Sequence, residues 1–144
     1  MLAFDISHIH PMLVHFPIAL LLVGFLVDLV ALMYKKEVCL SKCSFYLLLL
    51  GTLAIIVTWL SGALFTSEMT GAAGEIRETH ELVAAIAMLF AIITSVLRIY
   101  LVRQKVEKPG LKKLSFITYA LAAVCVGLAG AYGGTLVYGY MMPL

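Results

Sequence analysis

The chain has 144 residues, of which 63% are apolar and only 12% charged, and its formal net charge is +2. Soluble domains average about 45–50% apolar and about 25% charged residues, so a soluble enzyme, a nucleic-acid-binding protein and a disordered chain are all disfavoured. The mean hydropathy of +1.08 indicates an integral membrane protein instead. At this length the chain forms one domain.

Four apolar runs are each long enough to cross a bilayer, which takes about 20 helical residues. None alternates strictly between apolar and polar residues, so helices are favoured over barrel strands. We therefore expect an all-α integral membrane protein, a single-domain four-transmembrane-helix bundle with helices at about 12–34, 43–66, 80–103 and 112–138. Because Pro11 and Pro17 crowd the first helix, it begins near Phe16, or begins near Met12 and bends at Pro17.

The basic residues predict how the helices are oriented. Nine of the ten Lys and Arg residues lie in or beside the first and third connections, and only Arg77 lies in the second. The positive-inside rule then puts these two basic connections in the cytoplasm and both termini outside. The first apolar run is too long for a signal-peptide core, so we expect it to be retained as a helix.

The histidines are the main candidates for chemistry, and His8, His10, His15 and His80 all fall at the predicted outer end. His15 lies about one turn into the first helix and His80 begins the third, so on parallel helices their rings reach a similar depth. Two such imidazoles can ligate haem iron, while imidazole with the nearby methionines also suits copper. The competing interpretation is that the histidines bind nothing. Neither an HExxH nor a CxxCH motif is present.

Two charged residues within the apolar runs form a second constellation. Asp28 lies about 16 residues into the first helix and Arg98 about 18 residues into the third, so they reach a similar depth near the inner face. We expect a structural ion pair that locks the two helices, in preference to a proton path; the alternative is that Arg98 extends to the interface.

Small residues and cysteines are weaker signals. The second and fourth helices contain segments of small residues, which permit close helix contacts or leave room for a flat macrocycle, and packing alone is the preferred interpretation. A shift of the chain by about 65 residues lays His15 on His80 and Gly62 on Gly127, which hints at a repeat. Cys39 and Cys43 fall at the predicted cytoplasmic edge, where thiols stay reduced, and their role is left open.

Residues 10–20, HPMLVHFPIAL, resemble the HPxxVHFPIAL signature of a bacterial family of predicted four-helix membrane proteins of unknown function. The segments 80–84, HELVA, and 133–138, GGTLVY, are similar to later motifs of that family, so the resemblance covers nearly the whole chain. Relatives are fused to cytochrome c-like or Rieske-type domains, which implies a redox setting. The resemblance makes His10, His15 and His80 candidate ligands. Tyr132 stands where some relatives have a histidine, which leaves His15 with His80 as the preferred pair.

The favoured hypothesis is therefore a b-type haem protein of the bacterial inner membrane, which transfers electrons at a bis-His site near the outer, periplasmic face. His15 and His80 would ligate the iron, with His10 beside them and Arg77 meeting a propionate. One alternative is a copper-binding or transport module at the same face, and another is a non-catalytic scaffold subunit. An independent enzyme is not expected. The expected partners are the lipid bilayer and a redox protein or quinone; a homodimer is left open.

Overall fold

The computed structural model describes residues 9–34, 37–66, 68–105 and 107–140. All regular secondary structure in these ranges is helical, as predicted: α1 (Ile9–Leu13), α2 (His15–Met33), α3 (Val38–Phe65), α4 (Ala72–Gln104) and α5 (Pro109–Gly139). With α1 counted as the start of the first span, four helices are long and apolar enough to cross a membrane. The candidate residue His8 lies outside the described residues.

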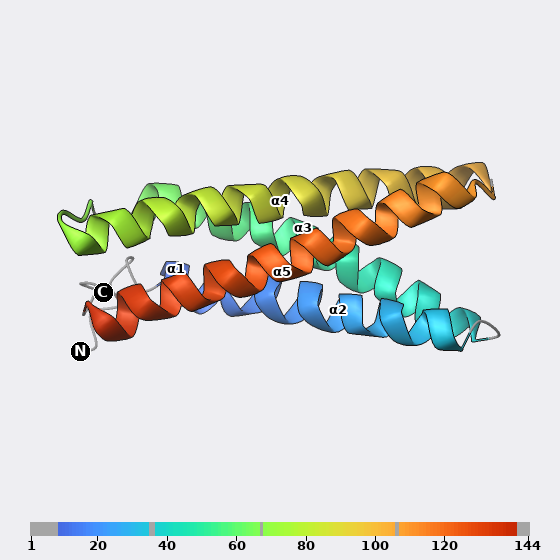
Figure 1. Ribbon diagram of the computed structural model, residues 1–144, viewed down its shortest axis with the longest axis horizontal. Coiled ribbons are helices and arrows are strands. Elements are labelled where there is room, and N and C mark those ends of the chain that lie inside the picture. Colours follow the sequence, from blue (N-terminus) through green and yellow to red (C-terminus); the bar gives the residue numbers. More distant parts are fainter. Residues whose placement is uncertain (1–8, 35–36, 67, 106, 141–144) are drawn as a thin grey trace.

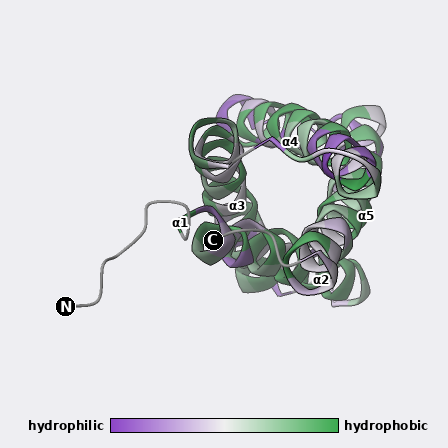
Figure 2. Ribbon diagram, turned by 90° about the vertical axis from the view of Figure 1, so that its left-hand side faces the viewer, coloured by the Kyte–Doolittle hydropathy of each residue, from purple (hydrophilic) through white to green (hydrophobic). Residues whose placement is uncertain are grey.

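The four long helices run up and down in chain order and form a ring. Each of α2 and α4 packs against both α3 and α5, so α2 and α4 lie diagonally across the bundle (Figure 2). Contacts within the α2–α3 and α4–α5 hairpins are more extensive than contacts between the hairpins. We call the end that carries α1, the α3–α4 connection and the end of α5 the histidine end, and the opposite end the basic end (Figure 1).

The bundle interior combines small apolar side chains with buried hydroxyl groups. Its core cluster consists of Leu21, Leu48, Ile55, Ala87, Ala91, Tyr119, Ala122 and Val126. The hydroxyls of Thr52 and Ser95 lie 2.8 Å apart between α3 and α4, and Thr94 donates to Thr118 at 2.8 Å between α4 and α5. Many large apolar side chains are exposed on the outside instead. Close contacts between small residues and hydrogen bonds between helices are typical of proteins whose surroundings are lipid.

The first span is interrupted at Val14, between α1 and α2, and it starts earlier than either alternative predicted from the sequence. Pro17 has no amide hydrogen, so the carbonyl of Leu13 loses its partner in the helix. The hydroxyl of Thr58 on α3 donates to this carbonyl at 3.3 Å and replaces the missing bond. The part of the first span before this break is the short helix α1, which carries His10 at the histidine end.

Helix α4 begins at Ala72, two turns before the predicted start at residue 80. The apolar run identifies only the part of a helix that suits lipid, whereas this helix continues through a charged segment. Gly71 precedes it with φ at 67°, a conformation that favours glycine. Arg77 and Glu81 form an ion pair of 2.9 Å one turn apart, which supports the added turns. His80 therefore lies inside α4 and not at its beginning.

Candidate functional site

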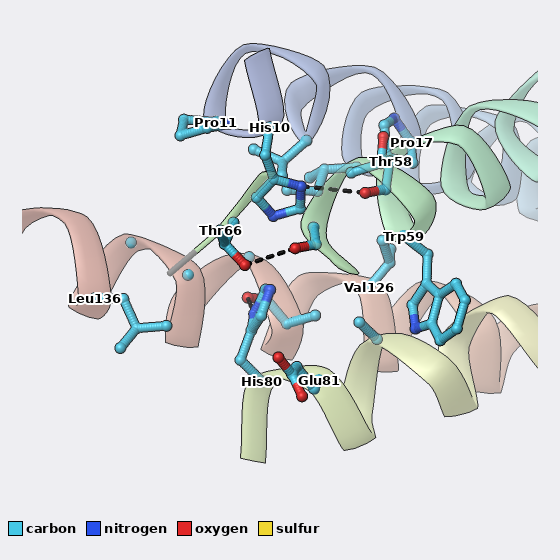
Figure 3. A pocket seen from close by; sticks show the side chains of 18 of the residues that line it. His10, Pro11, Pro17, Thr58, Trp59, Thr66, His80, Glu81, Val126 and Leu136 are labelled. Atoms are coloured by element: carbon cyan, nitrogen blue, oxygen red, sulfur yellow. Dashed lines mark hydrogen bonds between the residues drawn. The ribbon is translucent and has the colours of Figure 1, made fainter. Parts of the chain in front are cut away.

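Two histidines from diagonal helices meet at the histidine end. His10 on α1 and His80 on α4 have ring centroids 6.4 Å apart, with an angle of 82° between the ring planes. Figure 3 shows the two side chains directed toward one another from opposite sides of a pocket. Both rings are half-buried. This is the closest approach of two imidazoles among the described residues.

Backbone carbonyl groups fix the tautomer of both rings. Nδ1 of His10 lies 3.1 Å from the carbonyl oxygen of Thr58 and 2.9 Å from Oγ of Ser61. Ser61 donates its own hydrogen to the Thr58 carbonyl at 2.7 Å, so its oxygen accepts from His10. Nδ1 of His80 lies 2.9 Å from the carbonyl oxygen of Ala129. Carbonyl oxygens only accept, so both Nδ1 atoms carry hydrogen and each neutral ring keeps a lone pair on Nε2.

Neither Nε2 has a hydrogen-bond partner among the described residues. Histidines that bind metals donate their other ring N–H to a carboxylate, a backbone carbonyl or water, which orients the ring and makes the ligating nitrogen more basic. His10 and His80 both have this arrangement before any ligand is considered. The pair is therefore prepared to act as two nitrogen ligands.

A glycine lies directly against each imidazole. A Cβ atom added to Gly62 on α3 would lie 2.9 Å from Cε1 of His10, and one added to Gly133 on α5 would lie 3.2 Å from Cε1 of His80. Both distances are shorter than an ordinary contact between carbon atoms, about 3.5–4.0 Å. Each ring therefore rests against the backbone of the partner helix in its own hairpin, in a position that only glycine leaves open.

The two rings line a cavity of about 630 Å³ that receives residues from every helix. Most of its wall is apolar or small, including Ala63 on α3 and Gly130 and Gly134 on α5. Cavities that hold cofactors or drug-sized ligands measure about 300–1,000 Å³ and are mostly apolar, with a few convergent polar groups. This cavity has both properties, and His10 and His80 are its central polar groups.

The other residues predicted for the site lie at its edge. His15 also lines the cavity, but its side chain is exposed on α2 and is not paired with His80. Arg77 lies at the mouth, where it forms ion pairs with Glu68 at 2.5 Å and with Glu81 at 2.9 Å. The structure thus brings together His10 and His80, and not His15 and His80, because the added helix α1 carries His10 across the end of the bundle.

The residues that hold His10 in place were not among those predicted from the sequence. Thr58 and Ser61 lie one turn apart on α3 and both face the ring, with Gly62 beside them. Their signal in the sequence is a cluster of hydroxyl and small residues at the C-terminal end of an otherwise apolar run. Hydroxyl residues that recur at helical spacing in a membrane span commonly hydrogen-bond to a neighbouring helix.

In the described part of the chain, no group of three or more His, Cys, Asp and Glu side chains is placed to hold a metal ion. A bare ion such as Zn²⁺ usually takes four ligands, so two imidazoles alone make an incomplete site for it. An iron or copper ion that already carries ligands of its own needs fewer from the protein.

The predicted contact between Asp28 and Arg98 is present at the basic end. The guanidinium group holds both carboxylate oxygens, and Nη1 lies 2.9 Å from Oδ1 of Asp28. Ser44 on α3 donates to the same oxygen at 3.0 Å, and Nε of Arg98 donates to Ser115 on α5 at 3.0 Å. Every long helix therefore contributes to one buried cluster, which suits a structural lock. The three cysteines are free thiols.

No curated protein and no solved structure is significantly similar to this chain. A family model does match it, over residues 7–143. That range includes every residue of the site described above. The chain belongs to the family of predicted membrane proteins DUF2231.

Proposed function

We propose that the protein is a membrane-embedded b-type haem protein in which His10 and His80 are the axial ligands. The observation that carries the proposal is the opposed pair of imidazoles, each with Nδ1–H donated to a backbone carbonyl and Nε2 left free. The sequence favoured His15 as the partner of His80; the geometry favours His10. His15 would lie at the edge of the cofactor site.

The spacing of the rings agrees with a single metal centre between them. Nitrogen-to-metal bonds of imidazole are about 2.0–2.1 Å long, and the nitrogen lies about 1 Å from the ring centre, so two rings on opposite sides of one ion have centres roughly 6 Å apart. The centroids of His10 and His80 are separated by 6.4 Å. The perpendicular ring planes do not oppose this, because each imidazole can rotate about its bond to the metal.

The same spacing argues against other occupants of the space between the rings. Two hydrogen bonds of about 2.8 Å would already use most of the distance, so a quinol ring does not fit between the two imidazoles. A bare copper or zinc ion would have only two ligands from the described residues. Haem iron carries four ring nitrogens and needs only the two imidazoles.

A bound haem would supply a one-electron iron couple, and the protein would hold and tune it. Small residues along α3 and α5 would let the flat macrocycle approach the backbone, as Ala63 and Gly130 illustrate. Arg77 at the mouth would meet an acidic substituent in place of one of its carboxylate partners. With the histidine end outside, as the basic connections indicate, the site would serve electron transfer at the periplasmic face of the inner membrane.

The test is the visible absorption spectrum of the protein purified in mild detergent, in its oxidised and reduced forms. We expect a sharp Soret band that shifts on reduction. His10→Ala and His80→Ala should each abolish this spectrum or convert it to that of a five-coordinate haem. His15→Ala is the matched control, because this exposed histidine should leave the band unchanged.

Three other outcomes would contradict the proposal. A protein that remains colourless after haem is supplied during expression, and that contains no metal, would act as a scaffold whose histidines only hydrogen-bond. A colourless protein with stoichiometric copper would be a metal-binding module. A spectrum lost in His15→Ala but retained in His10→Ala would restore the pair expected from the sequence.

A further inference from the structure

The surroundings of the two histidines repeat along the chain. His80 follows His10 by seventy positions, and Ala129 follows Thr58, whose carbonyl holds His10, by seventy-one. The glycine that supports His80, Gly133, also follows Gly62 by seventy-one positions. In each hairpin, the first part of the chain supplies a histidine, and the second helix supplies the carbonyl group that accepts its hydrogen bond and the glycine that lies against its ring.

The buried positions of the first helix in each hairpin repeat with the same spacing. The buried residues of α2 are Pro17, Leu21 and Gly24. Seventy positions later, the corresponding residues of α4 are Ala87, Ala91 and Thr94, and all three are buried. The side chains differ at every one of these positions, so burial preserves a correspondence that residue identity does not.

The second helices correspond in the same way, seventy-one positions apart. Buried residues of α3 include Ser44, Leu48, Gly51, Thr52, Ile55 and Thr58. Their counterparts in α5, also buried, are Ser115, Tyr119, Ala122, Ala123, Val126 and Ala129. The ring order of the helices adds a further match, since a half-turn about the bundle axis exchanges α2 with α4 and α3 with α5. This spacing replaces the shift of 65 residues suggested by the sequence.

The two hairpins differ in charge at one equivalent, partly buried position. Arg98 follows Asp28 by 70 residues, and the two side chains form the ion pair at the basic end. The serine beside each is equivalent as well, because Ser44 donates to Asp28 and Ser115 accepts from Arg98. A hydroxyl group can serve either charge. The same framework therefore holds an acid in one hairpin and a base in the other.

We infer that the chain is a fused pair of homologous two-helix hairpins, and that Asp28 and Arg98 determine which hairpin pairs with which. The inner face of each hairpin therefore pairs with a hairpin that carries the opposite charge at this position. In this protein that partner is the other half of the same chain. Two copies of one hairpin would bring two aspartates or two arginines together in a partly buried site, which is unfavourable. The inference does not depend on the cofactor.

The test reverses the charges in the full-length protein. Asp28→Arg and Arg98→Asp are made singly and together, and each variant is examined by size-exclusion chromatography and thermal unfolding in detergent. The single variants should lose the monodisperse peak, because they place like charges together. The double variant should recover it, because Arg at 28 has Ser44 beside it and Asp at 98 has Ser115. Recovery of the peak should be incomplete. Arg98 lies 5.0 Å from the centre of the Tyr119 ring, whereas an arginine introduced at position 28 would have Leu48 at the equivalent place and no aromatic ring.

The matched control reverses the exposed pair Glu107 and Lys112, whose charged groups lie 2.8 Å apart where the connection between α4 and α5 meets the start of α5. That reversal should change neither the peak nor the unfolding temperature, because exposed ion pairs contribute little. A double variant at 28 and 98 that behaves no better than the single variants would refute equivalence of the two hairpins. Single variants that behave like the original protein would show that this position does not govern pairing.

Discussion

The glycine beside His10 offers the sharpest test of the proposed site, because Gly62→Ala should lower haem affinity without lowering the stability of the protein. The added Cβ would lie 2.9 Å from Cε1 and 3.3 Å from Nδ1 of His10. To restore an ordinary contact of about 3.5–4.0 Å, the ring must move by about 0.6–1 Å. The bond from Nδ1 to the Thr58 carbonyl, now 3.1 Å, would then leave the usual hydrogen-bonding range.

The size of both effects follows from this displacement. Loss of the group that orients a ligating histidine typically lowers metal affinity by about 10–100-fold, so we expect a loss of that order in haem affinity. The ring borders a cavity and has room to move, so the protein without cofactor should tolerate the methyl group. Replacing glycine by alanine inside a helix stabilises it by about 0.5–1 kcal/mol, so its unfolding temperature should be unchanged or higher.

The assay is a haem titration of the purified protein in detergent, followed at the Soret band, with thermal unfolding measured before haem is added. Gly133→Ala should show a smaller loss, because its Cβ would lie 3.2 Å from His80. Gly127→Ala on α5 is the control, since its Cβ would meet nothing within 4 Å and it does not line the cavity. Haem affinity in Gly62→Ala equal to that of the control would refute the reasoning.

Two further predictions concern the bundle core. Gly24→Ala should destabilise the protein strongly, because the added Cβ would collide with the hydroxyl of Tyr119. Tyr119→Phe alone should be neutral or stabilising by about 1 kcal/mol, since that buried hydroxyl has no partner among the described residues. In thermal unfolding, the double variant should be more stable than Gly24→Ala alone, and the absence of this partial rescue would refute the collision. Leu21→Ala should lower the free energy of unfolding by about 2–5 kcal/mol in chemical denaturation, because the Leu21 side chain is fully buried. A loss below about 1 kcal/mol would mean that the core collapses around the cavity left by the substitution.

The sequence alone determined the class of fold and one long-range contact. Length and hydropathy are local properties, so the apolar runs identified four spanning helices without knowledge of their packing. The contact between Asp28 and Arg98 was also predictable, because the helical rise fixes depth and an isolated charge in lipid requires a partner. The same reasoning about depth placed His10, His15 and His80 at one end of the bundle, where the structure has them.

Tertiary structure decided which histidines meet. Depth favoured His15, but the partner of His80 depends on how far each helix is rotated about its axis and on the break at Val14 that adds α1. Pro17 favours that break locally, but the bond that compensates for it comes from Thr58 on a different helix. The spacing of the repeat was hidden for a similar reason. Most equivalent buried positions share burial and not residue type, as Leu21 and Ala91 illustrate, and burial is a property that only the assembled bundle defines.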